Sequence, residues 1–154
     1  MSLLVLDSSA VAKRYLVETG TSWMRSITDP GAGTTIILAE ITLVEVSAAL
    51  TARFRAGSIS PAERDAAVRL LLQHADTEYQ LVPIRRCMVD RAVSLTQSHR
   101  LRGYDAVQLA VALIVNERYQ AAGLPALAFV AADDDLITAA HAEGLVADNP
   151  NRYP

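Results

Sequence analysis

The sequence predicts an α/β domain of three layers, in which helices cover both faces of a central, mainly parallel β-sheet. Short apolar runs typical of strands alternate with amphipathic segments typical of helices. The strand candidates lack polar alternation, so both faces of the sheet are expected to be covered. The chain has 154 residues, of which 51% are hydrophobic, and neither a linker nor a repeat divides it. We therefore expect one domain over residues 1–154.

The first predicted unit is a strand over residues 3–6 that ends at Asp7. A helix to about residue 16 follows, with Ser8 or Ser9 as its expected N-cap. After a turn at residues 29–31, a second strand is expected over 35–38 and a helix over 41–55, which Gly57 ends.

A capping box marks the next helix, expected over residues 61–74. Ser60 is its N-cap, Pro61 occupies its first position, and Glu63 completes the box. The remaining expected elements are a strand at 79–84, helices at 88–99 and 104–120, a strand at 127–131, a helix at 134–143, a strand at 145–147 and an irregular tail at 149–154.

Composition excludes several classes of protein. The 14 Lys and Arg against 17 Asp and Glu give a formal net charge of -3, which argues against nucleic-acid binding through bulk charge. The single cysteine, Cys87, has no partner for an intramolecular disulfide, and no Cys and His spacing fits zinc.

No apolar run approaches the roughly 20 residues of a membrane span, and no signal peptide is evident. We expect a cytoplasmic protein that does not bind membranes. A mean hydropathy of +0.22 hints at apolar surface covered by another subunit or partner.

Two acids follow predicted strands, where ligands bind in open α/β sheets. Asp7 comes directly after the first strand, and Asp133 comes after the strand that ends at Ala131. Each also fits a simpler role, because an aspartate between a strand and a helix is a good N-cap.

Two further acids lie on predicted helices. Glu45 shares a helical face with Ile41 and with alanines, so its carboxylate is expected to be paired, protonated or bound to metal. The simpler alternative for Glu45 is an ion pair with an arginine. Asp105 lies in the first turn of its helix, where an acid also stabilises the helix dipole.

Together the four acids predict a cluster at one edge of the sheet. Like-charged carboxylates brought close together must either take up protons or bind a cation. Oxygen ligands favour a hard ion, Mg²⁺ or Mn²⁺. Such ions support hydrolysis of a phosphoester without a protein nucleophile.

At these positions the sequence resembles the PIN-domain ribonucleases, specifically the VapC-type toxins of type II toxin–antitoxin modules. The similar segments are LVLDSSAVAK at 4–13, LVEV at 43–46, LRGYDAVQLA at 101–110 and ADDDL at 132–136. The resemblance implies a PIN-like fold and a metal-dependent endoribonuclease that cleaves transfer or ribosomal RNA and inhibits translation and growth. It also implies a cognate VapB-type antitoxin and a homodimer.

The resemblance also implies roles for six residues. Four carboxylates would bind the Mg²⁺ or Mn²⁺: Asp7, Glu45, Asp105 and Asp133. Ser8 or Ser9 matches a small hydroxyl residue that orients a carboxylate or a bound water.

The sequence departs from this pattern at Ala131, where many relatives carry Thr or Ser. Asp134 and Asp135 are alternative ligands, or first-turn acids of the last helix. Among the basic residues near the motifs, Arg102 is the best candidate for a contact with RNA phosphates because it lies just before Asp105.

Two other functions are compatible with parts of the pattern. One is a catalytically silent PIN-fold module that only binds a partner. The other is a magnesium-dependent phosphatase of the haloacid dehalogenase type, which requires a second Asp where this chain has Ser9.

Overall fold

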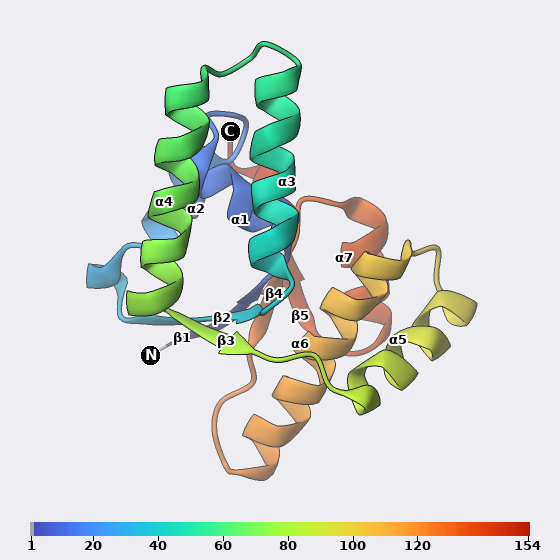
Figure 1. Cartoon of the computed structure of the whole chain (residues 1–154). Helices are drawn as coiled ribbons and strands as arrows, with labels where there is room; N and C mark the ends of the chain where they lie inside the picture. The colour runs from blue at the N-terminus through green and yellow to red at the C-terminus, as the bar shows by residue number, and fades with distance from the viewer. Residues whose placement is uncertain (1) are drawn as a thin grey trace.

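The computed structural model describes residues 2–154 and confirms the three-layer α/β architecture (Figure 1). All strand pairings are parallel, in the order β3-β2-β1-β4-β5. The strands are β1 (Ser2–Leu6), β2 (Thr34–Ala39), β3 (Tyr79–Val82), β4 (Ala128–Val130) and β5 (Val146–Asp148).

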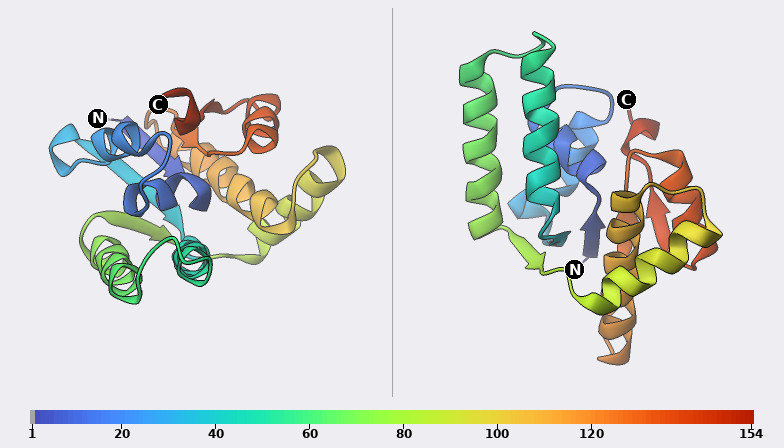
Figure 2. Two further views of the ribbon diagram at one scale, coloured as in Figure 1. Left: turned by 90° about the horizontal axis from the view of Figure 1, so that it is seen from above. Right: turned by 45° about the vertical axis from the view of Figure 1, so that its right-hand side comes forward.

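Helices cover both faces of this sheet (Figure 2). One face carries α1 (Ser8–Tyr15), α2 (Thr21–Ile27), α3 (Thr42–Arg55) and α4 (Pro61–Thr77). The other carries α5 (Arg86–Ser98), α6 (Gly103–Ala121) and α7 (Asp134–Ala142). Short 3-10 helices lie at η1 (Pro30–Ala32) and η2 (Pro150–Arg152).

The alternation of side chains along β1 divides the core into two clusters. Val5 packs with Leu109 and Phe129 on the α6 side, whereas Leu6 packs with Leu50 on the α3 side. Because successive strand residues point to opposite faces, an apolar run without alternation fits a sheet that is covered twice.

The strand order changes direction beside β1. The chain moves from β1 outward to β2 and β3, then returns to the opposite edge of β1 with β4 and continues to β5. In open α/β sheets, ligands bind at this switch point, beyond the carboxyl ends of the strands. The Asp7 amide donates to the Val130 carbonyl at 2.9 Å, so the loops after β1 and β4 start side by side.

Two local expectations are wrong, and one helix was missed. The N-cap of α1 is Asp7 rather than a serine, because its carboxylate accepts from the Ser9 amide. Helix α2 was not expected, since it has seven residues and follows Gly20 without a side-chain cap. The tail is not wholly irregular, because η2 forms within it.

The capping box and most element bounds are as expected. Ser60 accepts from the Glu63 amide, and the Glu63 carboxylate accepts from the Ser60 amide. Helix α4 nevertheless runs three residues past position 74, and β3 ends at Val82 instead of residue 84.

The C-terminal segment packs on α2. The rings of Trp23 and Tyr153 are stacked with centroids 4.4 Å apart, and the Tyr153 hydroxyl donates to Asp148 at 2.7 Å. Gly20 has a φ of +85° and lies directly against the Pro150 backbone, so a side chain there would collide with it.

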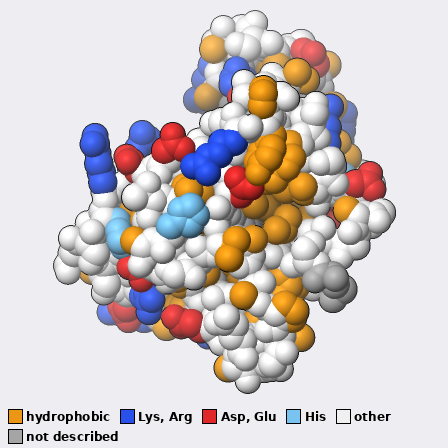
Figure 3. Space-filling model, turned by 180° about the vertical axis from the view of Figure 1, so that it is seen from behind, with side chains coloured by type: hydrophobic (Ala, Val, Ile, Leu, Met, Phe, Trp, Pro, Cys, Tyr) orange, Lys and Arg blue, Asp and Glu red, His pale blue; other side chains and the backbone are white. Residues whose placement is uncertain are grey.

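Apolar side chains remain on the surface. Val17 is 88% exposed and Val146 is 67% exposed. Figure 3 shows hydrophobic side chains gathered on the side opposite that of Figure 1. A hollow of about 390 Å³ is lined in part by Leu4, Trp23 and Ile27.

Among residues 2–154, no helix has the length and apolar character that a bilayer crossing requires.

The Pro150 contact predicts unequal effects of two glycine substitutions. Gly57→Ala is expected to lower the free energy of unfolding by about 1–2 kcal/mol, because Gly57 also has a positive φ but has open space around it. Gly20→Ala is expected to lower it by a further ~1–3 kcal/mol, because the new methyl group meets the Pro150 backbone. Urea denaturation of both variants measures the difference; equal losses would show that the C-terminal segment moves aside at no cost.

Candidate active site

Asp7 is the most enclosed of the predicted site residues, with 3% of its surface exposed. It follows β1, and its Oδ2 atom accepts hydrogen bonds from the Ser9 amide, at 2.9 Å, and from the Ser9 hydroxyl. Its Oδ1 atom is buried without a hydrogen-bond partner among residues 2–154. A buried acceptor of this kind normally has a partner, so this oxygen is the first sign of a ligand site.

Burial raises the pKa of Asp7 from 3.8 to about 6. The hydrogen bonds from Ser9 oppose this effect, and the negative charges of Glu45 and Asp105 add to it. Glu45 on α3 and Asp105 on α6 are therefore near enough to the carboxylate after β1 to repel it electrostatically.

Glu45 meets an amide rather than an arginine. The Gln108 Nε2 group donates to Glu45 Oε2 at 2.6 Å and to Thr42 Oγ1 at 2.9 Å. No ion pair of Glu45 exists among residues 2–154, so the alternative of an Arg partner is wrong. Gln108 was not predicted as a site residue, although it is the polar interruption in an otherwise apolar stretch of α6.

Asp105 and Asp133 face each other from the starts of α6 and α7. Burial raises the pKa of Asp105, and the charge of Asp133 raises it further, against a hydrogen bond from the Arg102 amide at 3.3 Å. Asp133 is the N-cap of α7 and accepts from the Leu136 amide at 2.9 Å. Asp7 and Asp133 thus both cap helices, and capping leaves one oxygen of each carboxylate outside the cap hydrogen bonds.

Ser9, rather than Ser8, connects the two loops of the switch point. Its hydroxyl donates to Asp7 and accepts from the Ala132 amide at 2.9 Å. Ser8 is half-buried and makes no side-chain hydrogen bond among residues 2–154. The oxygen of one serine therefore fixes the first acid relative to the loop that carries the last acid.

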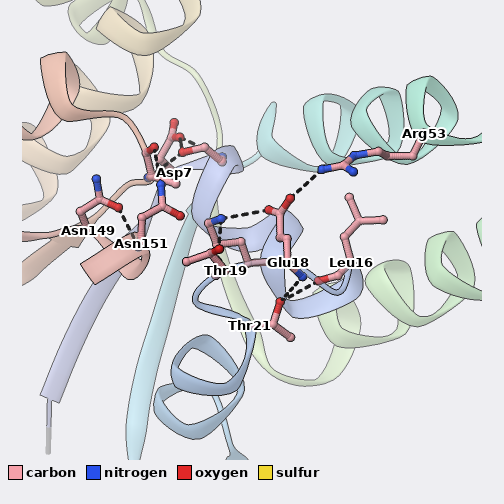
Figure 4. A network of polar contacts seen from close by, with 11 residues as sticks. Asp7, Leu16, Glu18, Thr19, Thr21, Arg53, Asn149 and Asn151 are labelled. Carbon is pink, nitrogen blue, oxygen red and sulfur yellow. Dashed lines mark hydrogen bonds and ion pairs between the residues drawn. The ribbon is translucent and has the colours of Figure 1, made fainter. Parts of the chain in front are cut away.

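Two asparagines of the C-terminal segment support the same loop, and neither was predicted. Asn149 is buried and donates to Asp134 Oδ1 at 2.8 Å, and Asn151 donates to the Ala132 carbonyl at 3.3 Å. Figure 4 shows both side chains near Asp7. The sequence predicted only an irregular tail over 149–154, and no local pattern in it indicates which loop these asparagines contact.

The donor set fits a hard cation, since it consists of carboxylate oxygens that include the unpartnered Oδ1 of Asp7. Among residues 2–154, however, no three Asp, Glu, His or Cys side chains are close enough together to hold one ion. Binding of one ion by three of these acids therefore requires their carboxylates to come closer together than they are in this structure.

A cleft of about 420 Å³ opens beside Asp105 and Asp133. Its other walls include His99, Arg100 and Arg102, so cationic groups lie next to the acids. Arg102 is exposed and lowers the pKa of Asp105 by its charge, although burial outweighs it. Asp135 lines the same cleft and lies 3.8 Å from Arg100.

Two other basic residues near the first motif are used within the fold. Lys13 is buried and pairs with Glu18 at 3.1 Å. Glu18 also pairs with Arg53 at 2.7 Å (Figure 4). Arg14 pairs with Glu78 at 2.7 Å. These contacts engage both basic side chains within the fold, whereas Arg100 and Arg102 line the cleft that also contains Asp105 and Asp133.

Comparisons with known proteins identify the fold. No family model and no curated protein matches the sequence. Among solved structures, FitAcB from Neisseria gonorrhoeae matches with a TM-score of 0.63 at 14% identity, over 96% of this chain and 97% of that one. The chain therefore has the same fold as FitAcB.

Two more structures of this kind agree. A toxin–antitoxin complex from Klebsiella pneumoniae matches with a TM-score of 0.58 at 17% identity, over 96% of this chain and 97% of that one. VapC20 from Mycobacterium tuberculosis, described as a sarcin-ricin loop cleaving toxin, matches with a TM-score of 0.60 at 16% identity, over 93% and 96%. The shared fold confirms the PIN-like α/β architecture expected from the sequence resemblance.

The environment of Asp7 predicts a pH-dependent gain of stability in Asp7→Asn without metal. Because the pKa of Asp7 is raised, the folded state of wild type holds the proton more tightly than the unfolded state does. The resulting stabilisation of wild type is complete below pH 3.8 and is lost as pH rises through about 6. As pH rises from 4 to 8, the free energy of unfolding of Asp7→Asn is therefore expected to increase by about 3 kcal/mol relative to that of wild type. This value follows from 1.36 kcal/mol for each pH unit between 3.8 and about 6. Urea denaturation in EDTA at several pH values measures it; a difference that does not change with pH would contradict the assignment.

Proposed function

We propose that this protein is a metal-dependent endoribonuclease of the VapC type. The observation that carries the proposal is the buried, unpartnered Oδ1 of Asp7 at the switch point of the sheet, within range of the negative charges of Glu45 and Asp105. A site that concentrates carboxylate oxygens in this way is suited to a divalent cation and to phosphodiester chemistry.

Four side chains would hold Mg²⁺ or Mn²⁺: Asp7, Glu45, Asp105 and Asp133. When bound, the cation supplies a Lewis acid that stabilises charge developing on a phosphate. Ser9 would hold one oxygen of Asp7 and leave the other for the cation. The cap bonds to Arg102 and Leu136 amides restrict the remaining two carboxylates.

Recognition of RNA is assigned to the cleft beside α6. Arg100 and Arg102 line it, and Tyr104 is 61% exposed nearby in sequence. Arginine can bind phosphate oxygens, and an exposed aromatic ring can stack on an unpaired base. With a net charge of -3, the protein would bind RNA through this local arrangement rather than through bulk charge.

Regulation would follow from a toxin–antitoxin pairing. The Klebsiella pneumoniae structure is a toxin–antitoxin complex, and the Mycobacterium tuberculosis structure is a toxin that cleaves the sarcin-ricin loop. By likeness of fold, we propose a VapB-type antitoxin as partner, a transfer or ribosomal RNA as substrate, and inhibition of translation in the cytoplasm as the result. A homodimer remains a prediction from the sequence.

Cleavage assays test the proposal directly. Antitoxin-free protein is expected to cut total RNA or transfer RNA into discrete products with Mg²⁺ or Mn²⁺ and to stop in EDTA. Asp7→Asn and Asp105→Asn are each expected to lower the rate by more than about 100-fold, because each removes a ligand of the cation. Asp76→Asn is the matched control, since Asp76 is an exposed acid on α4 far along the chain from the site.

The other functions predict different results in the same assay. A silent binding module would bind RNA or antitoxin without cutting under any metal condition. A phosphatase would release phosphate from a monoester substrate and leave internal RNA bonds intact. Cleavage that persists in both Asn variants would contradict the assigned site.

The cleft predicts a specific role for Arg102. Arg102→Gln is expected to weaken RNA binding about equally for different sequences and to lower the slope of log affinity against log salt by about 1, because one phosphate contact is lost. Arg69→Gln, an exposed change on α4, is the control. Fluorescence anisotropy across a salt series measures both, and an unchanged slope for Arg102→Gln would remove this residue from the RNA interface.

A further inference from the structure

Gln108 is the buried polar side chain for which neither the fold nor the four-acid site accounts. It has no exposed surface, although it lies on α6 among apolar neighbours. Burying an amide in such a place is unfavourable unless its groups are hydrogen-bonded. Both of its hydrogen bonds come from Nε2, and Oε1 has no partner among residues 2–154.

The amide connects the two helical layers beyond the carboxyl end of the sheet. Among residues 2–154, the bonds from Gln108 to Thr42 and Glu45 are the side-chain hydrogen bonds that join α6 to α3. Helices α3 and α6 otherwise pack in different core clusters on opposite faces. Gln108 also lies one turn after Asp105 on α6. Helix α6 therefore supplies one acid, Asp105, and through Gln108 also contacts the acid of α3, Glu45.

The orientation of the amide follows from charge. Turned the other way, its carbonyl oxygen would face the Glu45 carboxylate, and two acceptors would be opposed without a proton between them. Glu45 therefore fixes Nε2 toward itself, with Thr42 Oγ1 as the second acceptor at 2.9 Å. In turn the amide occupies Glu45 Oε2, while Glu45 Oε1 makes no hydrogen bond among residues 2–154.

We propose that Gln108 is a positioning residue that orients the Glu45 carboxylate toward the cation site. This inference rests on the proposed function, since it assigns Gln108 an effect on cation affinity through Glu45. Residues that hydrogen-bond metal ligands commonly change affinity or activity by about 10- to 100-fold when they are removed. Thr42 accepts the other hydrogen bond of the amide, and its contribution to cation affinity is expected to be smaller than that of Gln108.

Titration with Mn²⁺ alone, followed by electron paramagnetic resonance of the free ion, tests this proposal without RNA. Gln108→Met keeps the length of the side chain and removes the donors, and it is expected to raise the Kd for Mn²⁺ by about 10- to 100-fold. Gln120→Met, an exposed change on the same helix, is expected to bind as wild type does. Thermal unfolding of each variant tests whether a loss of Mn²⁺ affinity is due to unfolding. Gln108→Met is expected to stay folded, because it also removes the buried, unpartnered Oε1.

Two further variants separate positioning from simple packing. Thr42→Val removes the other α3–α6 hydrogen bond but leaves the one to Glu45, so it is expected to retain most of the affinity. In Glu45→Gln, addition of Gln108→Met is expected to cause no further loss, because Gln108 acts through Glu45. Equal losses in Thr42→Val and Gln108→Met, or additive losses in the double variant, would overturn the positioning role.

The outcomes also separate this inference from the proposed function. If wild type binds Mn²⁺ and cleaves RNA while Gln108→Met binds Mn²⁺ equally well, the positioning role fails and the nuclease stands. If wild type neither binds Mn²⁺ nor cleaves RNA, both fail.

Discussion

The arrangement of the acids in this molecule depends on one carboxylate that is almost completely shielded from water. Asp7 lies at the end of the central strand, and its burial raises its pKa to about 6. An ionised group in that position is unfavourable unless charge or hydrogen bonds compensate it. Ser9 compensates one oxygen only, and nearby acids increase the repulsion. The fold thus keeps negative charges close together in a buried place, and a bound cation would offset their repulsion. Such unfavourable arrangements are common at functional sites, where function is favoured over stability.

Uncharged polar side chains organise the acids around that carboxylate. Ser9 joins the loops after β1 and β4, Gln108 joins α6 to α3, and Asn149 joins the C-terminal segment to α7. Hydrogen bonds from neutral donors add no charge of their own, so they restrict carboxylates without neutralising them as an arginine would. The cationic groups lie in the adjacent cleft, where they remain available to an anionic substrate.

The main features of the site follow from local rules in the sequence. Asp7 and Asp133 are predictable because acids after buried strands come together at the switch point of a parallel sheet. Glu45 is predictable from its apolar helical face, but its partner is not. The contact with Gln108 joins positions that are 63 residues apart, and no periodicity in either helix encodes their relative placement. Helix α2 was missed for a related reason, because tertiary contacts such as the Trp23–Tyr153 stack stabilise it.

The strand order also determines when the site can form during synthesis. Strand β1 is translated before the other strands of the sheet, yet one of its two neighbours is β4, which begins only at Ala128. Asp7 cannot be enclosed until β4 pairs with β1, and the loop that carries Asp133 comes later still. Pairings between such distant segments also form slowly. A nascent chain therefore lacks the assembled acids until β4 and the loop that carries Asp133 have been translated.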